Sequence, residues 1–372
     1  MSRARSPIRD NLEYYAVRVV LGLLRTLPPR LCVGLLKGVG TLCHHVLRER
    51  REASVENVMA SLGVGRQRAL EITKHSFQGL ALNMGEPILL ERVLEGKPLE
   101  SHVQVDGAEN YDKLFDGKGG ILAMAHLGSW EGMGVVVERR FRPVHVVGRP
   151  LDNPKLRQFM YEVRSAGIKG HLPKDGIGMP IARLLKKGEP VAITLDQNSG
   201  RKGIMLDFFG RPAMQHKIHG VFAKRFGIPV VPLYVIRKPG LLRYHVVLED
   251  PIYADPDLPE EEAVIDVVSR VSASLERRIL EHPDQWLWIH DRWRRATRAL
   301  RKKARREARA RAEEAAQAEA AAQAAARARA ETGEGGAPGP ADGPGSDPAK
   351  AMGPGRPEGT NEGSRPQPAQ PS

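Results

Sequence analysis

The 372-residue chain is poor in cysteine and has no long apolar run. Its two cysteines, Cys32 and Cys43, have no zinc-type spacing, which argues against a disulfide scaffold and fits a reducing compartment. No stretch offers about 18 uninterrupted apolar residues, and no small-residue cleavage site of a secretory signal follows the basic N-terminus. The apolar content of 41% is ordinary for a globular chain. These absences exclude a disulfide-rich secreted scaffold and a protein that crosses a membrane many times.

The net charge of +13 is concentrated in one segment. Of the residues from Arg292 to Arg311, eleven are Lys or Arg and one is Glu, so the rest of the chain is close to neutral. Anionic lipid, an acidic protein and nucleic acid are candidate partners of such a segment. Nucleic acid is the weakest of them, because no aromatic residues are interleaved and no known nucleic-acid-binding module is present. We expect an anionic membrane surface, with plain solvation as the alternative.

Composition divides the chain into four segments. Residues 1–48 hold two apolar stretches interrupted by basic side chains such as Arg18 and Arg25, which is typical of amphipathic helices lying in a membrane interface; two ordinary helices packed on the core are the alternative. Residues 49–297 are expected to form the main domain. Residues 298–330 are rich in Ala, Arg and Glu without an apolar stripe, which predicts an exposed basic helix. Residues 331–372 are mostly Gly, Pro, Ala, Ser and charged, which predicts a disordered tail.

The main domain alternates between apolar, strand-like runs and helical stretches after residue 102. Strands are predicted at 120–125, 144–147, 191–195, 230–236 and 244–248. Helices are predicted at about 131–140, 154–166, 178–187, 218–226 and 260–282. This alternation predicts an α/β fold with a mixed, largely buried sheet flanked by helices.

The strongest local signal is the segment Ala125-His-Leu-Gly-Ser-Trp-Glu-Gly132, which lies between a predicted strand and a predicted helix. His126 therefore lies at the carboxyl end of a strand, where open α/β sheets bind ligands. His126 and Glu131 can meet only if His126 is in the loop and Glu131 in the first helical turn. A histidine oriented by a carboxylate is typical of a general base acting on a hydroxyl, and a purely structural hydrogen-bonded pair is the alternative. Ser129 is expected to cap the helix, because no Gly-x-Ser-x-Gly elbow marks it as a nucleophile.

The spacing of His126 and Glu131 resembles the His-x-x-x-x-Asp/Glu motif of glycerolipid acyltransferases. Further segments between about residues 50 and 295 resemble that group in the same order. They are Arg51 with Asn57 and Leu62, Val147–Pro154 followed by Arg164, Lys187–Val191 with Leu195-Asp196-Gln197, Phe208–Ala213, and His282–Trp293. As a set they are similar to the bacterial lipid A late acyltransferases, the lauroyl and myristoyl transferases of the lysophospholipid acyltransferase superfamily.

The resemblance implies an enzyme that moves a fatty acyl group from an acyl thioester to a hydroxyl of a membrane lipid, at the cytoplasmic face of the bacterial inner membrane. The donor would be acyl-carrier protein or coenzyme A, and no metal or other cofactor is implied. His126 would take the proton of the acceptor hydroxyl, and Glu131 would orient His126. Arg149 and Arg164 are candidates for binding a phosphate. Asp196 is a candidate for positioning the histidine or the arginine.

The sequence departs from the family pattern in ways that leave the acceptor open. Met214-Gln-His216 stands where the family has a threonine, Asp291 stands where a second basic residue is common, and no Phe-Pro-Glu-Gly block of glycerol-phosphate acyltransferases is present. A lipid A precursor, another glycolipid, a lysophospholipid and an aminolipid all fit. An acyl-thioester hydrolase and a catalytically silent membrane-binding module are further alternatives.

Clustered aromatic and basic residues outside the motif have simpler interpretations. Trp286, Trp288 and Trp293 are expected mainly to pack against the core, with the lining of an acyl channel as the alternative. The basic pairs Arg201-Lys202 and Lys224-Arg225 are expected to be solvated, with contact to an acidic carrier protein as the alternative.

Overall fold

The structure is a computed structural model that describes residues 6–148, 151–163, 167–173, 176–200 and 203–331. The chain divides into two compact units, residues 1–306 and 307–372. The sheet and the helices that carry the site belong to the first unit. Helix α12 (Arg294–Glu331) begins there and includes the segment 298–330, where the sequence predicts an exposed helix. The tail predicted for 331–372 lies, from residue 332 onward, outside the described residues.

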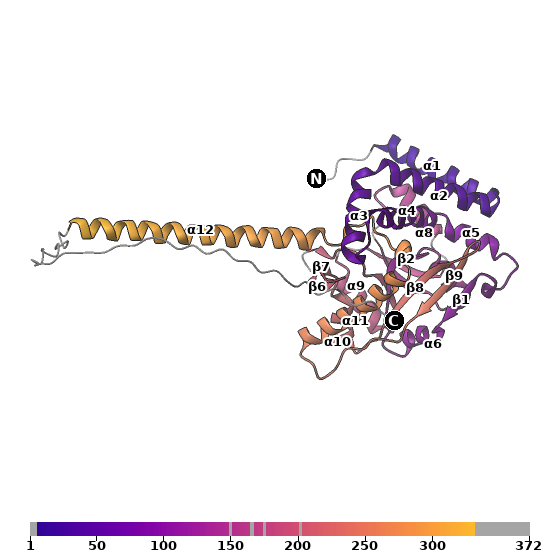
Figure 1. The fold of residues 1–372 in the computed structure, drawn as a ribbon. Coiled ribbons are helices and arrows are strands. Elements are labelled where there is room, and N and C mark those ends of the chain that lie inside the picture. Colours follow the sequence, from indigo (N-terminus) through magenta and orange to yellow (C-terminus); the bar gives the residue numbers. More distant parts are fainter. Residues whose placement is uncertain (1–5, 149–150, 164–166, 174–175, 201–202, 332–372) are drawn as a thin grey trace, which may run out of the picture. The chain divides into compact units, whose positions relative to one another are not determined.

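A seven-stranded sheet forms the centre of the first unit (Figure 1). In spatial order its strands are β1 (Val103–Asp106), β9 (Arg243–Leu248), β8 (Val230–Lys238), β2 (Ile121–Gly128), β5 (Val191–Thr194), β3 (Val144–Gly148) and β4 (Ile168–Pro173). The strands from β8 to β4 are parallel, whereas β9 pairs antiparallel with β8 and β1 runs parallel to β9. The fold is therefore mixed α/β, as predicted.

Helices cover both faces of the sheet. In chain order they are α1 (Pro7–Thr26), α2 (Pro29–Val46), α3 (Arg48–Leu62), α4 (Arg66–Asn83), α5 (Glu86–Val93), α6 (Ala108–Asp112), α7 (Met133–Arg140), α8 (Pro154–Val163), α9 (Gly178–Lys186), α10 (Ile218–Phe226), α11 (Glu260–Glu281) and α12, with 3-10 turns η1 (Leu99–Ser101), η2 (Lys113–Phe115) and η4 (Pro283–Gln285). Alternate residues of β2 define the two layers: Leu122 packs with α5 and α7, whereas Ile121 and Ala123 pack with α9, α10 and α11.

A third apolar cluster lies at the carboxyl end of β2. It joins Ala125 and Leu127 to residues of α3, α4 and α11, to the hairpin of β6 (Ile204–Phe208) and β7 (Arg211–Gln215), and to the segment after α11. Ala125 and Leu127 are almost fully buried. Because they flank His126 in sequence, the backbone on each side of the histidine is fixed by packing.

The five predicted strands are present as β2, β3, β5, β8 and β9, and the predicted helices after residue 130 are α7 to α11. The predictions missed β1, β4 and the hairpin of β6 and β7. β1 has only four residues, and β4 contains Gly170 and Pro173, which weaken a strand pattern. The predicted end of α8, at 164–166, lies outside the described residues.

The two N-terminal apolar stretches form α1 and α2, which join at Pro28 and Pro29 as the sequence indicates. α2 lies closely against α4, because Gly40 leaves no side chain in the way: a Cβ there would lie 2.5 Å from the Cα of Gln78. Among the described residues, no helix is both long and apolar enough to cross a membrane.

Candidate active site

His126 lies inside β2, at an irregularity near the end of the strand. β2 pairs regularly with β8 as far as Met124, after which the register shifts so that Gly128 faces Val235. Gly128 has a φ of +63°, and a Cβ there would lie 1.9 Å from the carbonyl oxygen of Val235, so only glycine fits. His126 therefore lies near the carboxyl end of a strand, as predicted, and the loop position that a contact with Glu131 was expected to need is not present, because the strand continues through the irregularity to Gly128.

The imidazole of His126 is bonded to the carboxylate of Asp196, which follows the neighbouring strand β5. The Nδ1 atom of His126 lies 2.8 Å from Oδ1 of Asp196, and the backbone N–H of His126 donates to Oδ2 at 3.0 Å. The carboxylate assigns the ring proton of the neutral histidine to Nδ1 and leaves the lone pair at Nε2. The Nε2 atom lies 3.4 Å from the amide nitrogen of Gln197. The ring is therefore held with its basic nitrogen away from Asp196.

Burial and charge keep this carboxylate ionised. The side chain of Asp196 is 3% exposed and that of His126 18%. Burial raises the pKa of Asp196, but the neighbouring charge of His126 and the hydrogen bonds from His126 and Trp286 outweigh it, so the pKa lies below the usual range. The imidazole is thus partly exposed, while the carboxylate lies in the protein interior.

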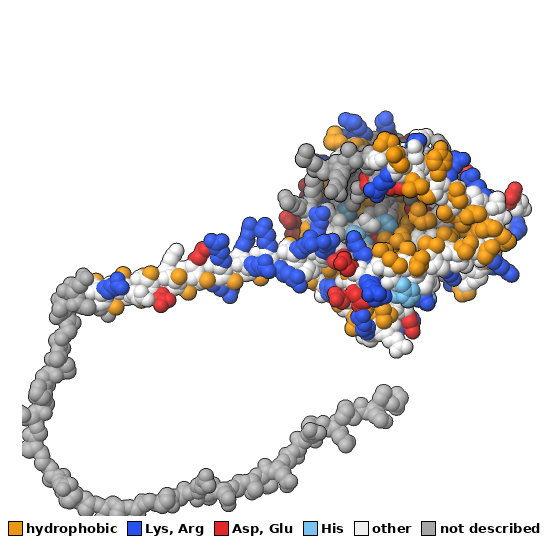
Figure 2. Space-filling view, turned by 90° about the horizontal axis from the view of Figure 1, so that it is seen from above, with side chains coloured by type: hydrophobic (Ala, Val, Ile, Leu, Met, Phe, Trp, Pro, Cys, Tyr) orange, Lys and Arg blue, Asp and Glu red, His pale blue; other side chains and the backbone are white. Residues whose placement is uncertain are grey.

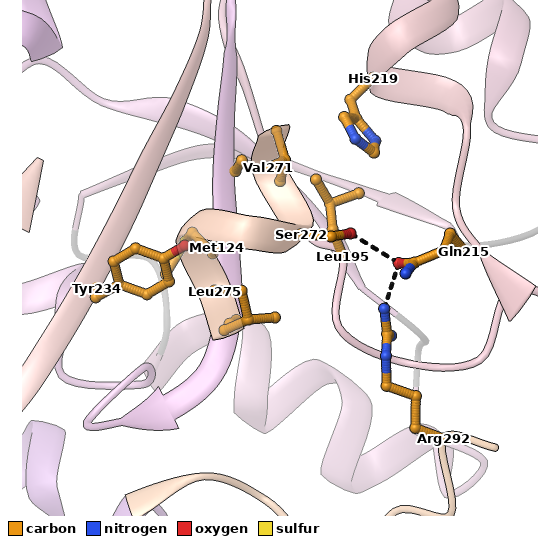
Figure 3. A pocket seen from close by; sticks show the side chains of 11 residues that line it. Met124, Leu195, Gln215, His219, Tyr234, Val271, Ser272, Leu275 and Arg292 are labelled. Atoms are coloured by element: carbon orange, nitrogen blue, oxygen red, sulfur yellow. Dashed lines mark hydrogen bonds between the residues drawn. The ribbon is translucent and has the colours of Figure 1, made fainter. Parts of the chain in front are cut away.

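Arg292 supports Asp196 from within the core. Its guanidinium donates to the backbone carbonyl oxygen of Asp196. It also donates to the side-chain oxygen of Gln215, which accepts a further hydrogen bond from Ser272 Oγ at 3.0 Å (Figure 3). The guanidinium carbon lies 4.1 Å from the centre of the Phe208 ring. Burial lowers the pKa of Arg292 to about 10, so the side chain stays charged at neutral pH.

On the other side, Asn83 of α4 holds the turn that follows β2. Its side-chain nitrogen donates to the carbonyl oxygen of Gly128 at 2.9 Å, and its side-chain oxygen accepts from the backbone N–H of Glu131 at 3.2 Å. One buried amide therefore fixes both ends of the turn. Glu131 itself lies in this turn, just before α7 begins at Met133.

Ser129 is anchored by a buried ion pair. Its hydroxyl donates to Oε2 of Glu86 at 2.7 Å, so the expectation that it caps the helix is wrong. Arg237 binds the same carboxylate through Nε at 2.6 Å and Nη2 at 2.7 Å. The hydroxyl turns to Glu86 because this bidentate pair places a strong acceptor beside it.

Of the predicted site residues, the structure places His126 and Asp196 in direct contact. The orienting position at Nδ1, which the resemblance gave to Glu131, is taken by Asp196, the other carboxylate that was named as a candidate for positioning the histidine. Glu131 is partly exposed at the end of the turn, and its role stays a prediction. Arg149 and Arg164 lie outside the described residues.

Residues that sequence reasoning did not place in the site come mainly from the segment after α11. Trp286 Nε1 donates to Oδ2 of Asp196 at 2.9 Å, and the backbone N–H of Leu287 donates to the carbonyl oxygen of His126 at 3.0 Å. His290 Nε2 accepts from the backbone N–H of Asn198 at 3.1 Å. The cluster of tryptophans and the resemblance of the segment His282–Trp293 to the family pattern were visible in the sequence, but nothing there showed that the segment reaches β2.

Among the described residues, no three His, Cys, Asp or Glu side chains are placed to hold a metal ion. The expectation that the reaction needs no metal or other cofactor stays a prediction.

Comparison with known proteins assigns the chain to a family. The sequence model of the bacterial lipid A biosynthesis acyltransferases matches residues 3–295. The chain belongs to this family. The acyltransferase is thus an enzyme of a group that acts on membrane lipids, and the resemblance drawn from its motifs is confirmed.

Individual relatives differ in the lipid that they acylate. A phosphatidylinositol mannoside acyltransferase of Mycolicibacterium smegmatis is 23% identical over 232 residues, which cover 60% of this chain and 72% of that protein. A lipid A biosynthesis palmitoleoyltransferase of Escherichia coli is 24% identical over 193 residues, which cover 51% of this chain and 61% of that protein. Among solved structures, the 1-acyl-sn-glycerophosphate acyltransferase PlsC of Thermotoga maritima aligns with 66% of this chain and 96% of its own, at 16% identity and a TM-score of 0.31.

The ion pair behind Ser129 predicts a large stability effect in the acyltransferase. Arg237→Met leaves the buried Glu86 carboxylate without its cation, and we expect a loss of about 3–5 kcal/mol in the free energy of unfolding, measured by urea denaturation. The double variant Arg237→Met/Glu86→Leu should recover much of this loss, because no buried charge is left unpaired.

The exposed pair of Arg68 and Glu71 provides the control. Both side chains are more than half exposed, so Arg68→Met should cost less than about 1 kcal/mol. Equal losses for Arg68→Met and Arg237→Met would contradict the anchoring role of the buried pair.

Proposed function

We propose that the acyltransferase moves a fatty acyl chain from an acyl thioester, carried by acyl-carrier protein or coenzyme A, to a hydroxyl of a lipid A precursor or a related glycolipid. The observation that carries the proposal is the His126–Asp196 pair at the end of β2, with Nδ1 bonded to the carboxylate and Nε2 left as the base. Family membership supplies the acyl-transfer class, and the relatives named above support a glycolipid acceptor.

The His126–Asp196 pair supports a mechanism in which His126 takes one proton from the acceptor hydroxyl and later gives it to the leaving thiolate. Nε2 of His126 takes the proton of the acceptor hydroxyl while its oxygen attacks the thioester carbonyl carbon. Asp196 stabilises the imidazolium that forms. The tetrahedral intermediate then expels the thiolate, which receives the proton from His126. The products are the acylated lipid and the free thiol of the carrier.

A hydrophobic face supports the binding of the enzyme to a membrane surface. Figure 2 shows hydrophobic side chains gathered on the side of the molecule formed by α1 and α2, next to a hollow in which histidine side chains are visible. The large apolar residues on the outer faces of the two helices repeat every three or four positions and are 48–79% exposed. They are Ile8, Leu12, Tyr15, Val19 and Leu23 in α1, and Leu31, Leu35, Val39, Leu42 and Val46 in α2.

The charge of the same helices fits an anionic surface. Arg18, Arg25, Arg30 and Lys37 are exposed on α1 and α2. Basic side chains beside an apolar face are typical of helices that lie in the interface of anionic membranes, where each contributes about 1 kcal/mol of attraction. We therefore place the enzyme peripherally on the cytoplasmic leaflet, where acyl-carrier protein and coenzyme A are available. The exposed basic residues of α12 are a second candidate for contact with anionic lipid.

Substitution of His126 and of Asp196 tests the mechanism. His126→Ala should lower the rate of acyl transfer by at least about 100-fold, and Asp196→Asn by a similar or larger factor, since each removes the oriented base. The assay is mass spectrometry of the acylated lipid with an acyl thioester donor. Because the pKa of Asp196 is lowered, the carboxylate stays ionised as the pH falls, and activity should be lost at the pH where the imidazole takes up a proton.

Comparison of Glu131→Gln with Asp196→Asn shows which of the two carboxylates orients His126. If Asp196 orients the histidine, Asp196→Asn should move the acid limb of the pH–rate profile to lower pH, because the protonated imidazole loses its carboxylate partner, whereas Glu131→Gln should leave the limb in place. A His126→Ala enzyme as fast as the wild type would contradict the general-base mechanism. Release of free fatty acid with no acylated lipid would instead indicate a thioester hydrolase.

The apolar face predicts a measurable loss of membrane binding. The triple variant Val19→Ser/Leu42→Ser/Val46→Ser should bind vesicles of phosphatidylethanolamine and phosphatidylglycerol roughly 100-fold more weakly, counting about 1 kcal/mol for each side chain partly buried in lipid. Sedimentation with the vesicles measures the binding. Leu280→Ser/Met179→Ser removes apolar side chains of similar exposure from α11 and α9 and should bind like the wild type. Equal losses in both variants would contradict an oriented membrane face.

A further inference from the structure

Three tryptophans lie side by side beneath the site, and their indole N–H groups have different acceptors. Trp286 and Trp288 are 1% exposed and Trp293 is 2% exposed. Trp288 Nε1 donates to the carbonyl oxygen of Pro283 at 2.7 Å, and Trp293 Nε1 to that of Phe208 at 3.3 Å. Trp286 Nε1 instead donates to the carboxylate of Asp196 at 2.9 Å. The three tryptophans are thus similarly buried, but only the N–H of Trp286 among them donates to the His126–Asp196 pair.

The indole of Trp286 helps to determine which carboxylate oxygen of Asp196 faces the imidazole. Oδ2 receives two hydrogen bonds, one from the backbone N–H of His126 and one from Trp286, while Oδ1 faces Nδ1 of His126. A carboxylate can rotate about its Cβ–Cγ bond, so fixed donors on one oxygen hold the other in place. Both donors here are rigid, because one belongs to a strand and the other to a buried ring.

The main chain of Trp286 is tied to the same strand that carries the histidine. Trp286 forms an isolated antiparallel bridge with Leu127, and the N–H of the following residue donates to the carbonyl oxygen of His126. The carbonyl oxygen of Trp286 accepts from Ser76 Oγ at 2.7 Å. The imidazole, the carboxylate and the indole therefore form one closed set of contacts that leaves the indole little freedom to move.

We propose that Trp286 is a positioning residue of acyl transfer, whose indole N–H holds the Asp196 carboxylate toward His126 and shares its negative charge. The inference rests on the proposed function, because it needs His126 to act as the base. The sequence alone indicates a packing role for this tryptophan, and packing does account for Trp288, whose N–H bonds to a backbone carbonyl of its own segment.

Loss of the Trp286 N–H has two consequences that a loss of packing alone would not have. The Asp196 carboxylate is less firmly oriented, so the chemical step slows. The carboxylate also loses a donor that stabilises its negative charge, so it stabilises the protonated imidazole more strongly, and the imidazole takes up its proton at higher pH. Since the base must be unprotonated to act, the acid side of the pH–rate profile moves to higher pH.

Other charged and titratable groups around the pair are unchanged by this substitution. His290 and Arg292 face it from the segment after α11, and Glu131 lies in the turn after β2. A shift of the pH–rate profile can therefore be assigned to the missing N–H of Trp286.

The test compares Trp286→Phe with Trp288→Phe, which removes an equally buried indole N–H from the same cluster. Trp286→Phe should lower kcat about 10-fold, as loss of an outer orienting partner does elsewhere, and leave the KM for the acyl donor nearly unchanged. The midpoint of the acid limb should rise by about half a pH unit or more. Trp288→Phe should keep the wild-type midpoint and a kcat within about 2-fold.

A second variant separates the hydrogen bond from the shape of the ring. Replacement of Trp286 by 3-benzothienylalanine keeps the bicyclic ring and substitutes sulfur for N–H, so the melting temperature should stay close to that of the wild type while the profile shifts as in Trp286→Phe. NMR titration of the His126 imidazole in both proteins gives the same shift without any substrate. A wild-type profile and titration for this variant, or an equal shift in Trp288→Phe, would overturn the inference. Activity that survives in His126→Ala would instead overturn the proposed function, and the two failures are thereby distinguished.

Discussion

The contact on which the site depends is the hydrogen bond between Nδ1 of His126 and the carboxylate of Asp196, two residues separated by 70 positions in the chain. They meet because β2 and β5 are parallel neighbours in the sheet, so their carboxyl ends lie at the same edge. A buried carboxylate is costly unless it is paired and hydrogen-bonded, and here the histidine, an indole and a backbone N–H meet that requirement. The same contacts leave the lone pair of the neutral ring at Nε2.

Two sets of buried polar groups hold this pair from opposite sides. The segment after α11 supports Asp196 through Trp286 and Arg292, whereas α4 and α5 hold the turn after β2 through Asn83 and Glu86. Removal of one member of such a network lowers the free energy of unfolding strongly, because it leaves a buried polar or charged group without its partner. The site is therefore rigid at the His126–Asp196 pair, while the apolar helices α1 and α2 leave their outer faces exposed to what we propose is lipid.

The sequence predicted the fold class and the position of His126 near the end of a strand, because both depend on local patterns. Buried strands appear as apolar runs, and the His126 segment lies between such a run and a helix. The partner of the histidine was harder to predict: a five-residue spacing favoured Glu131, whereas the structure uses Asp196, whose proximity depends on strand order. The contacts of Trp286 and Arg292 could not be predicted, because nothing in a single sequence shows that the segment after α11 returns to β2. Short strands such as β1 and β4 were missed because their patterns are weak.

The most direct test of the account is the tautomer of His126, read from the ¹⁵N chemical shifts of its imidazole by NMR in the full chain, with His126→Gln identifying the signal. We predict that the neutral ring carries its proton on Nδ1, with Nε2 unprotonated, and that this preference is lost in Asp196→Asn. A ring protonated at Nε2 in the wild-type protein, or one whose tautomer is the same in Asp196→Asn, would contradict the pairing from which the mechanism follows.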